Sequence, residues 1–189
     1  MLSAPPESVS AGGRYTRTAI TLHWAIAVLI ACGFGLGWTM THLTATPLRL
    51  LLINWHKSVG ISVLCLAILR TGWRLRNPPP QPLPMPTWQR LAARGSHAVL
   101  YLLLFALPLA GWASSNAAGH PVVYFGIVHL PALGPKDEHL AKLCAMAHTT
   151  LGMSLLLLIV VHTAAALKHH FIERDATLER MLLATSKHR

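Results

Sequence analysis

Two histidines, His148 and His162, lie in an apolar stretch near the carboxyl end of the chain, residues 145–167. This stretch has no Lys, Arg, Asp or Glu over 23 residues. The two histidines are fourteen residues apart, about 40° short of four full helical turns, so a helix would place both imidazoles on one face. Their separation along the helix axis would be about 21 Å. Two imidazoles at two depths require a partner at each depth, and histidines on other helices could provide it.

Three more histidines, His23, His56 and His97, lie in or at the start of other apolar stretches. None of these stretches contains Asp or Glu, which excludes carboxylate-bridged metals and the usual carboxylate proton relays. Imidazoles paired across helices are typical of bis-histidine haem b, whose porphyrin faces are apolar. Zinc normally takes a third or fourth protein ligand at each site, so a zinc centre fits this pattern less well.

Glycines follow two of the histidines by one helical turn. Gly60 follows His56, and Gly152 follows His148, each at a spacing of four residues. A glycine on the same face removes the side chain that would strike a porphyrin ring, although ordinary close packing of helices explains such glycines equally well.

Four apolar stretches predict an all-α integral membrane protein, a four-transmembrane-helix bundle. The composition agrees, with 53% hydrophobic and 12% charged residues and a mean hydropathy of +0.46. We expect a flexible tail over residues 1–13, a four-helix domain over residues 14–182 and a basic tail over residues 183–189. The predicted spans cover residues 18–40, 51–73, 95–114 and 145–167.

Two long connections separate these spans. Residues 77–88, with six prolines, are expected to be extended and non-helical. Residues 115–144 are expected to be a long, mostly polar connection. Pro108, inside the third span, is expected to kink it.

The basic residues are distributed unevenly along the chain. Twelve of the sixteen Lys and Arg residues lie in the two terminal segments and in the connection after the second span. The positive-inside rule therefore predicts that the N and C termini are both cytoplasmic. The net charge of +10 then indicates topology and contact with a lipid surface rather than nucleic-acid binding.

This topology sorts the histidines by depth. His23, His97 and His162 lie toward the inner side of the membrane, and His56 and His148 toward the outer side. The pattern predicts two haem groups, with the outer one between His56 and His148. It leaves open whether His23 or His97 faces His162, and the histidine without a partner is expected to be an interfacial or supporting residue.

Five longer segments carry a recognisable pattern: RYTRTAITLHW, NWHKSVGIS, SHAVLYLLLFALPLAGW, AHTTLG and VVHTAAALKHHFIERDATLERML. They resemble the bacterial cytochrome b561 family, small di-haem membrane proteins linked to quinone. The resemblance covers residues 14–182, and its fourth-span motif is the most specific. The chain is more distantly similar to the cytochrome b subunits of membrane formate dehydrogenases and hydrogenases.

The resemblance implies two haem b groups in a protein of the bacterial inner membrane. It implies that His23 and His162 ligate the inner haem iron and that His56 and His148 ligate the outer one. Within the family the chain looks most like a superoxide-oxidising member, which implies superoxide as the electron donor and ubiquinone as the acceptor. The longer N-terminus and the extra C-terminal residues depart from the family pattern without touching the haem positions.

Charged and polar residues near the membrane surfaces are candidates for the remaining roles. Arg70 and Arg74 could bind haem propionates through charge-assisted hydrogen bonds. His169, seven residues after His162 and near the same face, is a candidate donor to a quinone carbonyl. These groups could equally bind lipid phosphates.

Three lysines of the outer side are candidates for steering superoxide toward the outer haem: Lys57, Lys136 and Lys142. Interfacial lysines whose charged groups reach the lipid headgroups would give the same pattern.

Two other functions remain open from the sequence. The first is a haem-bearing membrane anchor that relays electrons from a partner dehydrogenase to the quinone pool. The second is a histidine-lined metal transporter, which would contain no haem. The three scattered cysteines form no CxxCH motif, which argues against covalently attached haem.

Overall fold

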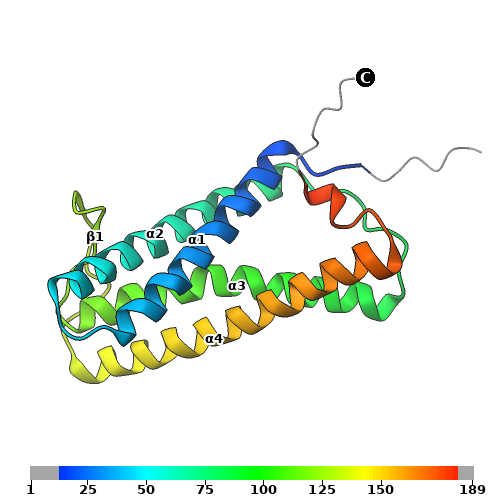
Figure 1. Cartoon of the computed structure of the whole chain (residues 1–189). Helices are drawn as coiled ribbons and strands as arrows, with labels where there is room; N and C mark the ends of the chain where they lie inside the picture. Colours follow the sequence, from blue (N-terminus) through cyan, green and yellow to red (C-terminus); the bar gives the residue numbers. More distant parts are fainter. Residues whose placement is uncertain (1–12, 183–189) are drawn as a thin grey trace, which may run out of the picture.

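The computed structural model describes residues 13–182, which form a bundle of four long helices running alternately in opposite directions (Figure 1). The first and last described residues lie at the same end of the bundle (Figure 1). The predicted tail residues 1–12 and 183–189 lie outside the described part. The four helices are α1 (Arg17–His42), α2 (Pro47–Arg76), α3 (Thr87–Ala117) and α4 (Glu138–Lys168).

All four helices are long enough and apolar enough to cross a membrane, which confirms the predicted fold class. Large apolar side chains in the middle of each helix face outward, and Val28, Leu69, Leu102 and Leu157 are all more than half exposed. Such a surface suits contact with lipid tails rather than water. Each predicted span lies inside one helix, but α3 begins at Thr87, eight residues before the predicted start.

Local signals explain where the helices begin. Thr16, Thr46 and Asp137 are the N-caps of α1, α2 and α4, and the side-chain oxygen of each accepts a backbone N–H from three residues later. Pro47 follows its cap at the first helical position, where the missing N–H costs nothing. Pro108 lies inside α3 and is buried there.

The bundle consists of two helical hairpins. Helix α1 packs closely along α2, and α3 packs closely along α4, whereas the described residues of α1 and α4 make hardly any close backbone approach. A small core of Ile26, Val63, Ala67 and Leu104 joins α1, α2 and α3. Figure 1 shows α1 and α4 diverging toward the end that holds the chain termini. The two helical hairpins therefore pack against each other through α2 and α3, while the side between α1 and α4 is loosely packed.

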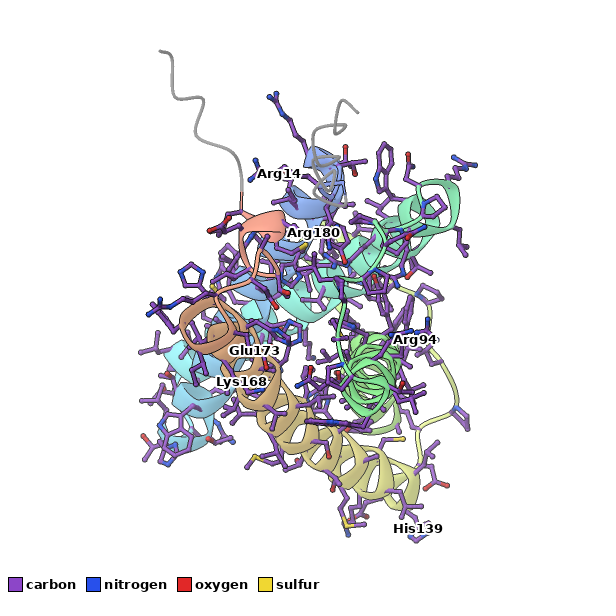
Figure 2. The ribbon with its side chains drawn as sticks, turned by 90° about the vertical axis from the view of Figure 1, so that its right-hand side faces the viewer. Arg14, Arg94, His139, Lys168, Glu173 and Arg180 are labelled. Carbon is purple, nitrogen blue, oxygen red and sulfur yellow. The ribbon has the colours of Figure 1, made fainter. Side chains whose placement is uncertain are left out.

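The two ends of the bundle differ in charge. The end that holds the termini contains the last turns of α2 and α4 and the first turns of α1 and α3, where most of the Arg residues lie. In Figure 2, Arg14 and Arg180 lie at this end, and His139 lies at the opposite end of α4 from Lys168. We call the end that holds the first and last described residues the basic end. The opposite end, where the chain turns from α1 to α2 and from α3 to α4, is called the hairpin end.

A short β-hairpin forms part of the long, mostly polar connection predicted over residues 115–144. Strands β1 (Val123–Tyr124) and β2 (Val128–His129) pair antiparallel. The hairpin is tied to α2 because Ser58 Oγ accepts a hydrogen bond from the backbone N–H of Phe125 at 3.0 Å. This β-hairpin was not anticipated from the sequence, because the hydrogen bond that holds it comes from α2, far away in the sequence.

The segment after α4 returns to the start of α1. It contains a π-helix, η1 (His169–Glu173), and a short 3₁₀ turn, η2 (Glu179–Met181). Arg174, between them, has a left-handed backbone conformation with φ of 53°. Trp24 donates its indole N–H to the Met181 carbonyl at 2.8 Å, which fastens this segment to α1.

Candidate functional site

At the hairpin end, the ring of His56 from α2 lies edge to face against the ring of His148 from α4, with centroids 6.0 Å apart. The Nδ1 of His56 donates to the Gly33 carbonyl at 3.0 Å, and the Nδ1 of His148 donates to the Leu107 carbonyl at 2.9 Å. These bonds fix each ring's orientation and tautomer, so Nε2 is the nitrogen available to a metal. Two imidazoles that share one metal ion, with bonds of about 2 Å each, have centroids about 6 Å apart.

Glycines allow these two rings to lie against neighbouring helices. A Cβ atom at Gly111 of α3 would lie 2.8 Å from the His148 ring, and one at Gly37 of α1 would lie 3.4 Å from the His56 ring. The first contact is too short for any other residue without movement of the ring. These positions were not among the predicted site residues, although Gly37 lies in a small-residue pair visible in the sequence. Nothing in the sequence points to Gly111.

The two glycines singled out from the sequence have different surroundings. A Cβ at Gly60 would meet nothing within 4 Å, so space is open beside it. A Cβ at Gly152 would meet only the Leu107 side chain, at an ordinary 3.8 Å. Neither glycine contacts a histidine ring, and the role of both beside a haem remains a prediction.

At the basic end, three histidine rings meet instead of two. The centroids of His23 and His162 are 6.3 Å apart, and those of His97 and His162 are 5.4 Å apart. His97, expected to be an interfacial or supporting residue, lies against the His162 ring. His97 comes from α3, which packs closely against α4, and this tertiary contact brings its ring against His162.

Arg70, Arg74 and Tyr101 form a polar cluster beside these histidines. Arg70 Nε donates to the Tyr101 hydroxyl at 3.1 Å, and one of its terminal nitrogens donates to the Ala19 carbonyl at 3.4 Å. The Arg74 guanidinium lies 5.6 Å from the centre of the Tyr101 ring. The two predicted arginines are thus brought together, and Tyr101 is an addition. Its position one helical turn after His97 could have indicated it.

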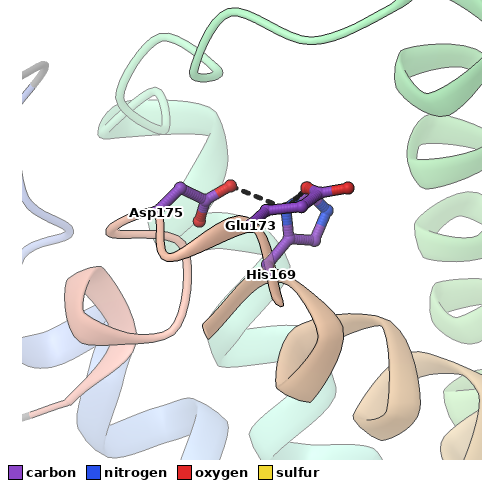
Figure 3. Close-up of side chains that lie close together, drawn as sticks. All are labelled: His169, Glu173 and Asp175. Carbon is purple, nitrogen blue, oxygen red and sulfur yellow. Dashed lines mark hydrogen bonds and ion pairs between the residues drawn. The ribbon is translucent and has the colours of Figure 1, made fainter. Parts of the chain in front are cut away.

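His169 lies in the π-helix and is surrounded by carboxylates (Figure 3). Its Nδ1 lies 2.6 Å from Glu173 Oε2 and 2.7 Å from Asp175 Oδ2, and Lys168 pairs with the other Glu173 oxygen. Partial burial pushes the pKa of Asp175 upward, but hydrogen bonds from Thr177 and His169 outweigh it and hold this pKa below its usual value. Asp175 is therefore ionised at neutral pH, and His169 Nε2 is the nitrogen left for another partner.

The three lysines predicted at the hairpin end do not form one cluster. Lys57 Nζ donates to the Pro121 carbonyl at 3.4 Å, beside the β-hairpin. Lys142 pairs with Glu138 at 2.7 Å, and both side chains are highly exposed. Lys136 and Lys142 line a shallow depression of about 510 Å³ between α3 and α4, together with Asp137 and Glu138. The two acidic residues offset much of the positive charge there.

Three features of the described residues fit a haem at each level. Each level holds imidazoles from both helical hairpins, one formed by α1 and α2 and the other by α3 and α4. Helices α1 and α4 do not pack closely against each other. The centroid separations of 6.0 and 6.3 Å suit one metal ion between two imidazoles. The buried indole N–H of Trp112, next to Gly111, has no hydrogen-bond acceptor among the described residues. A haem propionate would provide one.

Comparison with known proteins agrees with this geometry. Residues 14–184 match the family model described as prokaryotic cytochrome b561. The chain is 39% identical to cytochrome b561 homolog 2 of Escherichia coli K12, over 89% of this chain and 91% of that protein. It is 32% identical to cytochrome b561 homolog 1 of the same strain, over 89% and 97%. It is also 30% identical to the probable superoxide oxidase CybB of Yersinia pestis, over 89% and 96%.

The family match covers nearly the whole described chain, and the relatives are matched almost from end to end. Haem and membrane electron transfer follow from the family and agree with the paired histidines between four membrane-spanning helices. The chain therefore belongs to the prokaryotic cytochrome b561 family of multi-pass membrane electron-transfer proteins.

Proposed function

We propose that this protein is a di-haem oxidoreductase that takes electrons from superoxide at the hairpin end and reduces ubiquinone at the basic end. The observation that carries the proposal is the pair of histidine contacts along α4, His148 with His56 and His162 with His23. Fourteen residues of helix separate the two α4 histidines, or about 21 Å. This spacing places one centre near each membrane surface.

In this proposal, four histidines would ligate the haem irons. His56 and His148 would hold one iron, and His23 and His162 would hold the other. Bound haem b supplies one-electron chemistry, and the protein holds the groups at fixed depth and tunes them. The hydrogen bonds from Nδ1 of His56 and His148 to backbone carbonyls keep those rings in a single orientation.

The orientation in the membrane follows from charge. The basic end carries most of the Lys and Arg residues, so it faces the cytoplasm, and the first and last described residues lie on that side. In a bacterium this membrane is the inner membrane. The hairpin end then faces the periplasm, where superoxide is oxidised.

At the hairpin end, the roles of the lysines are electrostatic. Lys57 adjoins His56 in the sequence and is the steering residue best placed beside the outer centre, because Glu138 neutralises Lys142. Lys136 contributes from the depression between α3 and α4. A positive potential here raises the local concentration of a small anion without binding it tightly.

At the basic end, the protein would bind the haem propionates and ubiquinone and take up protons. Arg70 and Arg74 would bind the propionates of the inner haem, and Tyr101 accepts a hydrogen bond from Arg70. His169 offers Nε2 to a ubiquinone carbonyl, since its Nδ1 is held by Glu173 and Asp175. Both carboxylates can only accept hydrogen bonds, so Nε2 donates when the ring is doubly protonated.

The overall reaction balances. Two superoxide anions each lose one electron and become dioxygen. Ubiquinone gains these two electrons and two protons from the cytoplasmic side and becomes ubiquinol.

The test uses the purified protein in detergent or proteoliposomes. We expect a pyridine haemochrome assay to give two haem b per chain and a visible spectrum of low-spin haem. Superoxide alone should reduce the haem, and added ubiquinone should reoxidise it. His169→Ala should slow reoxidation at least tenfold while leaving reduction by superoxide unchanged.

Other results would point elsewhere. Haem that superoxide does not reduce, but that a co-purifying dehydrogenase reduces, would identify the protein as an electron-relay subunit. A protein without haem after expression in cells supplied with haem would contradict the proposal.

A further inference from the structure

The basic end contains one imidazole more than a bis-histidine iron needs. His162 has two histidine neighbours, His23 at 6.3 Å and His97 at 5.4 Å between ring centroids. At the hairpin end, His56 and His148 contact each other, and no third histidine ring of the described residues lies against them. The two centres therefore differ in how many possible ligands surround them.

The three rings at the basic end come from the two halves of the bundle. His97 and His162 belong to α3 and α4, which pack closely along their length. His23 belongs to α1, which packs on α2 and makes little close contact with α4. His97 and His162 therefore approach the inner centre from one half of the bundle, and His23 approaches it from the other half.

The separation of the rings indicates which pair binds the iron at rest. The distance of 6.3 Å between His23 and His162 matches the roughly 6 Å expected for two imidazoles on one metal ion. His162 also shares a helix face with His148, the ligand of the other centre. His97 lies beside this pair rather than completing it.

We propose that His97 is a replacement axial ligand of the inner haem, able to take the place of His162 opposite His23. The proposal rests on the proposed function, because it assumes a haem between His23 and His162. Its basis is that His97 reaches the same centre from the same side as His162. A side chain whose ring lies 5.4 Å from the ring it replaces could reach that position through a new rotamer.

The test compares matched ligand deletions at the two ends. In His162→Ala, we expect the protein to retain both haems, with the inner one still low-spin by electron paramagnetic resonance but with shifted g values. The double variant H162A/H97A should lose the inner haem and keep the outer one. The described residues of the hairpin end include no third histidine ring, so His148→Ala should lose the outer haem and keep the inner one.

Haem content per chain and the resonance spectrum read ligation directly and do not depend on turnover. If His162→Ala retains only the outer haem, or if the inner haem becomes high-spin, His97 is not a replacement ligand. His162→Gln, with a polar side chain that better preserves packing, repeats the test if the alanine variant assembles poorly. Loss of both haems in both variants would also overturn the proposal, since a replacement ligand should preserve assembly.

Failure of the proposed function would give a different result from failure of the role proposed for His97. Wild-type protein with fewer than two haems would contradict the di-haem assignment before any variant is made. Wild-type protein with two haems and a His162→Ala variant with one would contradict only the role of His97.

Discussion

The two ends of this bundle bring histidine rings together in different ways. At the hairpin end, two histidine rings lie edge to face, their Nδ1 atoms are bound to backbone carbonyls, and glycines admit their rings. At the basic end, three histidine rings meet beside two arginines and a tyrosine. Backbone carbonyls fix the rings at the first site, and the second site is a cluster of histidine, arginine and tyrosine side chains.

This difference indicates how each centre should respond to change. Backbone carbonyls and glycines leave little room for adjustment, because moving them requires moving a helix. Side-chain clusters can rearrange through rotamers at modest cost. We therefore expect single substitutions to remove the outer centre outright and to retune the inner one. The following predictions test this contrast, from the largest expected effect to the smallest.

The largest effect is expected for His148→Leu. It removes one of the two imidazoles at the hairpin end, and the outer haem should be lost while the inner haem remains. Haem content and redox titration measure this. His139→Leu, an exposed position on the same helix, should retain both haems. Loss of both haems, or of neither, in the His148 variant would contradict the two-level assignment.

Gly111→Ala should produce a large but incomplete loss of the outer haem. The new Cβ would lie 2.8 Å from the His148 ring, and overpacking of this kind costs about 1–3 kcal/mol. Outer haem occupancy should fall several-fold, which the haem-to-protein ratio measures. Gly35→Ala is the control, because a Cβ at this exposed α1 position would meet nothing within 4 Å. Equal occupancy in both variants would argue against a rigid site.

Arg70→Gln should change the inner centre without removing it. The variant loses a positive charge and charge-assisted hydrogen bonds, each worth about 1.5–3 kcal/mol. The oxidised, more positive form of the haem should gain stability, so its midpoint potential should fall by tens of millivolts. Arg76→Gln, exposed at the end of the same helix, should leave the potential nearly unchanged. A fall in the midpoint potential of the outer haem instead would contradict the placement of Arg70 beside the inner haem.

The smallest effect is expected for Lys57→Glu. Reversal of this charge should slow the reduction of haem by superoxide about two- to tenfold at low ionic strength, and added salt should shrink the difference. Stopped-flow measurement of the Soret band at several salt concentrations checks both. A rate that does not change at any salt concentration would show that Lys57 does not steer superoxide.

Much of the arrangement was predictable from periodicity and charge. The apolar stretches predicted four membrane helices because the bilayer requires a fixed length of helix without charge. The fourteen-residue spacing of His148 and His162 predicted two depths because helical geometry is regular. The contacts of His56 with His148 and of His23 with His162 match the pairs implied by the family resemblance.

Other features depended on contacts between residues distant in the sequence. Residues 115–144 looked like a polar connection, but the extension of α3 to Ala117, the hairpin on α2 and the start of α4 at Glu138 shorten it. The histidine spacing along one helix says nothing about α3, so His97 seemed to lack a partner. The glycines that touch the ligand rings lie on helices other than those of the rings.

The sequence by itself determined the membrane fold, the family and the two depths at which imidazoles occur, because helix length, periodicity and charge are local properties. Only the tertiary structure decided which helices approach closely enough to bring three rings together at one end and two at the other. The reason is that α3 packs on α4 while α1 diverges from it, and no repeating pattern within one helix specifies the distance to another. That unequal packing gives the rigid outer site its glycine contacts and the inner site its additional histidine.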